Sequence, residues 1–154
     1  MSLVYNAAKF AGLGSGGVYA WISAPVLATL VSNNYTPNPD DVYASAMSGA
    51  ELSGGTWSGL FAGSIRQPLQ SKTDTNNTTD DQTEHDAADM TWSGISAGTV
   101  HGVILLLHSN ALGSGFSNGN APLLAYLSVV ATVTNSGSFT CSWANSGLIV
   151  LASG

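Results

Sequence analysis

The chain has 154 residues, the length of one domain and enough to bury a core without a disulfide or a metal. Charged side chains make up only 8% of it, with three basic and nine acidic residues and a formal net charge of −6. Nucleic-acid binding needs clustered Lys and Arg to neutralise phosphates, and three scattered cations do not provide such a cluster. Adhesion to anionic lipid is disfavoured for the same reason.

Membrane insertion and secretion are not expected. The longest uninterrupted apolar run, residues 103–107, is far shorter than the roughly 20 residues that a spanning helix needs. Lys9 interrupts the segment where a secretory signal would have its apolar core. The single cysteine, Cys141, rules out an intramolecular disulfide and suits synthesis in a reducing cytoplasm. Its place in an alternating run predicts a small buried side chain rather than a nucleophile.

The first 17 residues are predicted to form an N-terminal arm, followed by a β-domain over residues 18–154. Apolar residues at helical spacing predict a helix over residues 3–13. Four glycines between Gly12 and Gly17 then end the helix and form a flexible hinge. This glycine run lacks the Lys-Ser/Thr of a phosphate-binding loop, and no strand precedes it.

The first part of the β-domain alternates short apolar runs with turn chemistry. Asn and Pro residues between 33 and 40 predict a turn, and Asp40 is expected to cap a helical turn over residues 42–47. Pro68 places the strand that contains it at the edge of a sheet, where Arg66 and Lys72 would discourage pairing with other chains. The strands predicted here are residues 18–22, 26–31, 56–65 and 67–72.

Residues 73–81 (TDTNNTTDD) read as a polar, solvated loop. Six acidic residues lie between Asp74 and Asp89, so we asked whether they form a calcium loop or the paired carboxylates of a glycosidase. A calcium loop of the EF type needs a Gly at its sixth position, which is absent here. A solvated acidic edge is the simpler interpretation of these carboxylates, and no metal site is predicted.

Residues 85–107 are expected to organise the domain as two neighbouring central strands. Met90 and Trp92 fall on one face of the first strand. Residues 100–107 are apolar on both faces, which is typical of a strand that is covered on both sides by a second layer or by a neighbouring subunit. Val103, Leu105 and Leu107 are therefore candidate interface residues.

The remaining chain predicts more strands and one long loop. Phe116 stands out in the loop over residues 109–120, either as a candidate interface residue or as a side chain that folds back on the core. Strands are predicted at residues 123–133, 138–143 and 148–151, with a hairpin turn at 135–137. Short strands at such spacing indicate an all-β fold, and we expect a single-domain antiparallel β-sandwich, jelly-roll-like, with a short N-terminal helical arm.

No constellation for catalysis is apparent in the sequence. His101 and His108 would point to opposite faces of one strand, and so would the adjacent His85 and Asp86. No Gly-x-Ser-x-Gly motif sits between a strand and a helix. We therefore predict no catalytic residue, no cofactor and no enzymatic activity.

Seven short motifs follow one another along the chain: YNAAK (5–9), NYTPNPDD (34–41), ELSG (51–54), DTNN (74–77), DAADMTWS (86–93), PLLAYL (122–127) and GSFTCSW (137–143). Together they resemble a family of small structural proteins of tailed bacteriophages. This chain reads Asp86-Ala87-Ala88-Asp89 where that family usually reads Asp-Ala-Asp-Asp. The resemblance implies an all-β component of the virion.

Two functions follow from the resemblance. The first is a capsid decoration (cement) protein on the exterior of the head, a homotrimer that binds the major capsid protein. Its arm would contact the shell through Tyr5, Lys9 and Phe10. The alternative is a low-copy neck or tail component, or a receptor- or glycan-binding module. Exposed Trp side chains would favour glycan binding, since sugars stack on aromatic faces.

Overall fold

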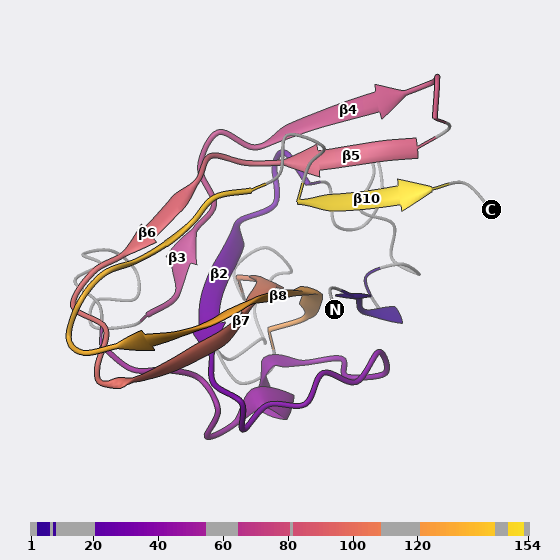
Figure 1. Ribbon diagram of the computed structural model, residues 1–154. Coiled ribbons are helices and arrows are strands. Elements are labelled where there is room, and N and C mark those ends of the chain that lie inside the picture. The colour runs from indigo at the N-terminus through magenta and orange to yellow at the C-terminus, as the bar shows by residue number, and fades with distance from the viewer. Residues whose placement is uncertain are drawn as a thin grey trace.

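A computed structural model of the chain describes residues 3–6, 8, 21–54, 65–80, 82–108, 121–143 and 148–152 (Figure 1). These residues form three antiparallel sheets, with strand orders β1-β8-β7-β2-β3, β10-β5-β4 and β6-β9. The expected all-β, antiparallel class is confirmed. The elements are β1 (Leu3–Val4), β2 (Val26–Val31), the 3-10 helix η1 (Ala44–Met47), β3 (Gln67–Pro68), β4 (Thr73–Asn77), β5 (Gln82–Asp86), β6 (Met90–Trp92), β7 (Gly98–Leu107), β8 (Leu123–Thr134), β9 (Phe139–Cys141) and β10 (Ile149–Ala152).

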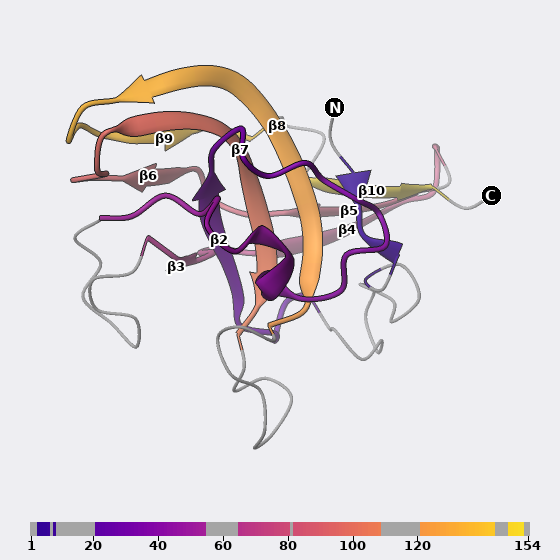
Figure 2. The ribbon, with the colours of Figure 1, turned by 90° about the horizontal axis from the view of Figure 1, so that it is seen from below.

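The centre of the five-stranded sheet, formed by β2, residues 102–107 of β7 and residues 123–126 of β8, is buried on both of its faces. One face packs against a core that includes Met90 and Trp92 of β6, Phe139 and Cys141 of β9, and Ile149 of β10. The opposite face is covered by the segment that follows β2, which wraps around the sheet and carries η1 (Figure 2). Both layers of cover therefore come from the same chain.

Strand β7 shows this two-sided burial residue by residue. Val103, Leu105 and Leu107 belong to the core on the side of the small sheets. Ile104 and Leu106 belong to the core beneath η1. The predicted two-sided burial of residues 100–107 is confirmed, and no neighbouring subunit is needed to cover either face.

Several strand pairings differ from the expected ones. Strand β6 pairs with β9, whereas β7 pairs with β2 and β8, so residues 85–107 do not form two neighbouring strands. Strands β8 and β9 lie in different sheets, so residues 135–137 do not close a hairpin. Residues 73–77 form strand β4, which pairs with β5, instead of a loop. An edge strand that faces solvent can be polar throughout, and its sequence then resembles that of a loop.

The chain start is part of the sheet. Leu3 and Val4 form β1 and pair with Tyr126 and Ala125 of β8, so the predicted helix does not include them. Tyr5, which follows β1, is fully buried in the core beneath η1. The rest of the proposed arm lies largely outside the described residues, as do residues 55–64 and 109–120.

Asp40 does not cap η1. Tyr43 occupies the cap position and makes no side-chain capping bond. The Asp40 carboxylate instead accepts a hydrogen bond from Asn6 Nδ2 at 2.8 Å. Trp21 and Ile22 lie in a turn, so the strand predicted at residues 18–22 does not include them. Residues 18–20 are outside the described part of the chain.

Three polar groups fasten the chain start to the turn before η1. The Tyr35 hydroxyl donates to Asp41 Oδ2 at 2.8 Å. The Tyr5 hydroxyl lies 2.6 Å from that of Tyr35 and therefore donates to its oxygen. Burial raises the pKa of Tyr5 from 10.0 to about 12. Burial is also the main cause that raises the pKa of Tyr35, and the hydrogen bond to Tyr5 adds to it.

Gly102 of β7 lies beneath the Tyr126 ring of β8, and a Cβ at Gly102 would overlap that ring. We expect Gly102→Ala to lower the free energy of unfolding by about 1–3 kcal/mol, because Tyr126 would have to leave its place. Denaturant unfolding measures the loss. Gly137→Ala is the control, since a Cβ there meets nothing within 4 Å, and equal stability of the two variants would contradict the prediction.

The tyrosine network predicts a loss of stability in alkali. Because the pKa of Tyr5 is about 12 in the folded chain and about 10 when unfolded, its contribution is complete below pH 10 and is lost as the pH rises towards 12. The loss is about 3 kcal/mol. Tyr5→Phe should be less stable at neutral pH by about 1 kcal/mol and should show a shallower decline above pH 10 in urea unfolding. Parallel declines in the two proteins would contradict the prediction.

Candidate binding surface

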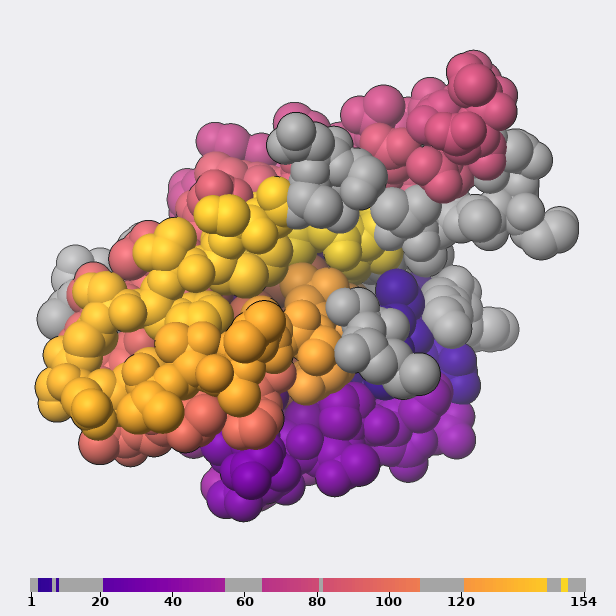
Figure 3. All heavy atoms as spheres, viewed as in Figure 1, coloured from indigo at the N-terminus to yellow at the C-terminus, as the bar shows by residue number. Residues whose placement is uncertain are grey.

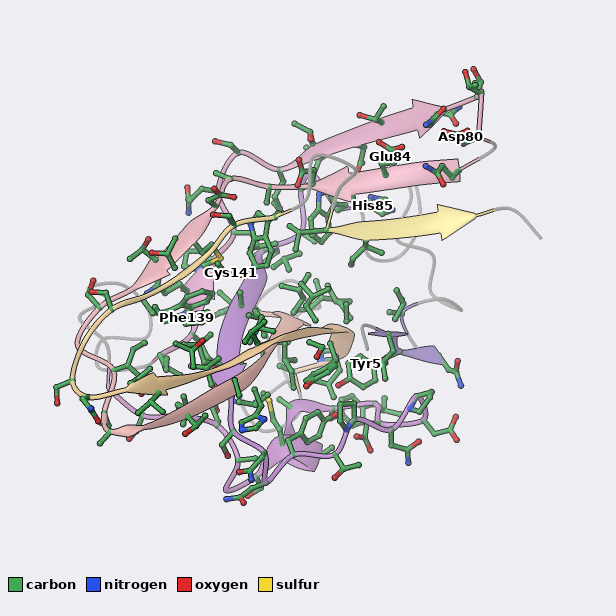
Figure 4. The ribbon with its side chains drawn as sticks, in the orientation of Figure 1. Tyr5, Asp80, Glu84, His85, Phe139 and Cys141 are labelled. Carbon is green, nitrogen blue, oxygen red and sulfur yellow. The ribbon has the colours of Figure 1, made fainter. Side chains whose placement is uncertain are left out.

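Formal charge is segregated along the chain. All nine acidic and all three basic residues precede residue 90, and residues 90–154 contain none. The hairpin of β4 and β5 carries Asp74, Asp80, Glu84 and Asp86, and Figure 4 shows Asp80 at its tip and Glu84 farther along β5. The arrowhead of β8 lies at the opposite end of the molecule (Figure 1). The hairpin is therefore an acidic region, and β8 itself carries no charged side chain.

Two of the three cations are bound within the chain. Arg66 makes a two-pronged ion pair with Glu51, with N–O distances of 2.7 and 2.9 Å. The Lys72 ammonium donates to the carbonyl oxygens of Trp21 and Ala24 and lies 5.9 Å from the centre of the Trp21 ring. Burial lowers the pKa of Lys72. These cations join β3 and the start of β4 to the chain around β2.

His85 forms a buried polar cluster with residues of β4 and β5. Its Nδ1 lies 2.6 Å from Asp74 Oδ1, and its ring is 5.5 Å from the ring of Trp21. Trp21 Nε1 donates to the Asp86 carbonyl at 3.1 Å. The Nε2 atom of His85 is buried and has no hydrogen-bond partner. An imidazole held by a carboxylate resembles a general base, but the side chain of His85 has no exposed surface in this structure.

Carboxylates near the tip of the hairpin accept hydrogen bonds from side-chain amides of the same hairpin. Asn77 Nδ2 donates to both Asp80 and Glu84 at 2.9 Å, and Gln82 donates to Glu84 at 2.8 Å. These amide donors, Asn77 first, lower the pKa of Glu84. Within the described residues, no group of three or more His, Cys, Asp or Glu side chains is placed to hold a metal ion.

A hollow of about 430 Å³ lies beside η1. The Glu51–Arg66 ion pair forms one side of it, and the Thr29 hydroxyl also donates to Glu51 at 2.6 Å. The Glu51 carboxylate is therefore already bound from two sides. The lining residues are Ala44, Ser45, Met47, Ser48, Gly49, Glu51 and Arg66.

The distal half of β8 exposes the most apolar surface. Val130 is 87% exposed and Val133 is 67% exposed, more than any other large apolar side chain in the described residues. Ala131 and Thr132 between them are also exposed. We call residues 130–133 the β8 patch. Its atoms lie at the left end of the space-filling view (Figure 3).

The residues predicted to form an interface are not gathered at one surface. Val103, Leu105 and Leu107 are fully buried in the main core, and Tyr5 is fully buried in the core beneath η1. The chain itself covers these four side chains, which were expected to contact another subunit or a partner. Lys9, Phe10 and Phe116 lie outside the described residues.

The aromatic and sulfur-containing candidates are mainly core residues. Trp21 and Trp92 are fully buried and offer no face for stacking on a sugar. Phe139 and Cys141 point inward from β9 (Figure 4). Burial raises the pKa of Cys141 to about 11, which keeps the thiol protonated, in agreement with the small buried side chain predicted from the sequence.

The β8 patch was missed because its sequence predicts only a strand. The run SVVATVT at 128–134 is rich in β-branched residues and free of charge, which suits an interior strand as well as an edge. Within the described residues β1 pairs only with Ala125 and Tyr126 of β8, at the end of the strand away from the patch. The absence of charged side chains from the run was the one available signal.

Comparison with known proteins identifies no relative. No family model, no curated protein and no solved structure matches the chain. Among the described residues, no helix has the length and apolar character to cross a membrane.

From the His85 cluster we predict that alanine substitutions at two acidic residues of one hairpin change the stability by different amounts. Asp74→Ala removes the partner of His85 Nδ1 and leaves a buried polar atom unsatisfied. We expect the free energy of unfolding to fall by about 1–3 kcal/mol in denaturant titrations. Asp80→Ala removes the same charge at the exposed tip and should change stability by no more than about 0.5 kcal/mol. Equal losses of stability in the two variants would contradict the prediction that Asp74 stabilises the fold through His85.

Proposed function

We propose that the protein is a structural component of a tailed-phage virion, a decoration protein that binds the major capsid protein on the exterior of the head. The observation that carries this proposal is the uncharged, exposed β8 patch on a domain whose apolar strands are already covered internally. Interface centres are depleted of charge, because charged groups must be desolvated when partners meet. The sequence resemblance to phage structural proteins supplies the setting.

The proposed fold is a jelly-roll-like β-sandwich. The support for two layers is the main core, which contains residues from the five-stranded sheet and from both small sheets. Contacts between sheets that are far apart in sequence make such a domain rigid, which suits a clamp. In the described residues, long-range contacts of this kind link β2, β6, β7, β9 and β10.

Stabilisation of the shell follows from mass action. A protein that binds only the assembled capsid lowers the free energy of the assembled state and opposes the loss of capsomers. The acidic balance favours the exterior of the head over its DNA-filled interior, because like charges repel. Contacts of Lys9, Phe10 and Phe116 with the shell stay predictions, as does a homotrimer.

Removal of residues 1–17 is unsuited as a test of these contacts. The deletion would remove β1 and the Tyr5 side chain, which bonds to Tyr35. Loss of capsid binding would then reflect a damaged fold. A count of chains in intact particles avoids this difficulty.

Quantitative mass spectrometry of purified virions tests the proposal. We expect a copy number of the same order as that of the major capsid protein, because decoration sites repeat with the shell lattice. A few copies per particle would replace the proposal with the alternative of a neck, tail or receptor-binding component. Absence of the chain from particles would overturn both.

A further inference from the structure

We infer that His85 is an acid-sensitive latch, which holds the β4–β5 hairpin against the turn of Trp21 and releases it when the imidazole takes up a second ring proton. The inference goes beyond the proposed function and does not depend on it, because it concerns a movement within the free protein. It rests on three observations: the burial pattern of the hairpin, the contacts of the His85 ring, and the charges around that ring.

The β4–β5 hairpin is anchored to the core through one side chain of its own. Of the residues that the structure describes in β4 and β5, only His85 is buried, and its side chain has no exposed surface. The other residues of both strands are exposed or half-buried. Histidine is the side chain whose charge ordinarily changes between pH 5 and 8. The hairpin therefore depends for its docking on a group that titrates.

The His85 ring is held by one polar contact and one ring contact. Its Nδ1 lies 2.6 Å from Asp74 Oδ1, and its centre lies 5.5 Å from that of the Trp21 ring. A carboxylate only accepts hydrogen bonds, so Nδ1 carries the proton of the neutral imidazole and Nε2 carries none. Trp21 is in turn bonded to the hairpin, because its Nε1 donates to the carbonyl oxygen of Asp86 at 3.1 Å.

A proton on Nε2 of His85 would create a charged N–H group with nothing to accept it. The Nε2 atom is buried and has no hydrogen-bond partner among the described residues. A buried charged donor without an acceptor costs more free energy than a buried neutral atom without a donor. When the hairpin moves away from Trp21, water reaches Nε2 and accepts the bond. Acid therefore favours the released arrangement over the closed one.

The charges nearest the ring do not remove this cost. The Asp74 carboxylate attracts a protonated His85, but it also attracts the ammonium of Lys72, whose pKa it raises against the larger, lowering effect of burial. That ammonium lies 5.9 Å from the centre of the Trp21 ring, on which His85 also packs. Protonation would thus bring a second cation to a place where one carboxylate already serves the first, and like charges repel.

The other elements packed against His85 bring no charge to its ring. In β5 the acidic residues Glu84 and Asp86 are its immediate neighbours, and neighbours in a strand point to opposite faces of the sheet. Residues 21–24, which form the turn of Trp21, contain no charged or titratable side chain. Neither do residues 148–152, which begin with the Leu148 N–H donor to the His85 carbonyl and include β10.

Proton exchange of the Trp21 indole N–H, followed by NMR on the full chain, tests the latch. This group donates to Asp86 in the closed arrangement and meets water when the hairpin is released. The Trp92 indole N–H is the internal control, because it is also fully buried and donates to the Ile65 carbonyl at 2.8 Å. Protection is measured against the exchange of a free indole at the same pH.

We expect the protection of the Trp21 indole to fall about tenfold to thirtyfold between about pH 7.5 and about pH 5.0, while that of Trp92 stays constant. The reason is linkage: a free histidine takes up its proton below about pH 6.5, so each further unit of acid raises the released fraction by up to about tenfold. The latch is therefore closed above this range and opens as the pH falls through it.

Two variants assign the effect to one histidine. His85→Phe keeps a ring beside Trp21 that cannot take up a proton, so the protection of the Trp21 indole should no longer change with pH. His101→Phe is the matched control, because it removes an imidazole from β7, outside the hairpin, and should keep the full response.

Three outcomes would each overturn the inference. They are a Trp21 protection that is independent of pH in the unmodified protein, an equal fall for Trp21 and Trp92, and an unchanged fall in His85→Phe. The first two are measured on the unmodified protein, so the test stands even where the Phe variant does not fold. None of these outcomes bears on the copy number in virions.

Discussion

The fold depends on the need to cover strand β7 on both faces. Its run of five large apolar residues from Val103 to Leu107 alternates between two cores, and none of the five is exposed. Burial of each such side chain contributes about 1.5–3 kcal/mol, so the five together match the whole net stability of a typical domain. The five-stranded sheet must therefore lie in the middle, between the small sheets and the segment that carries η1.

Internal cover of β7 determines what is left for the surface. The apolar strands pack within the chain, the cations Arg66 and Lys72 bind within the chain, and His85 is held by Asp74. The exposed groups are then mostly neutral and polar, apart from the acidic hairpin and the β8 patch. Residues 130–133 carry no charged side chain, so little charge has to be desolvated if another protein covers the β8 patch.

Local patterns identified elements well and pairings poorly. Residues 26–31 were predicted as a strand with its observed bounds, and Met90 and Trp92 were correctly placed on a buried face. The partners of these strands were not predicted, because pairing depends on residues far away in the sequence. The polar strand β4 was read as a loop, since its stability comes from pairing with β5 and not from its own side chains. The Asp74–His85 contact followed from that same pairing and was missed with it.

The sequence by itself determined the all-β class, the scarcity of cations, the two-sided burial of residues 100–107 and the buried character of Cys141. Each of these depends on composition or on the alternation of side chains within one segment. Only the tertiary structure decided what covers β7, and with it the fate of Val103, Leu105 and Leu107 as core residues. It also decided which part of β8 is exposed, because Val130 and Val133 are uncovered whereas residues 123–126 are buried. Exposure is a property of neighbours in space, and one strand's sequence does not contain them.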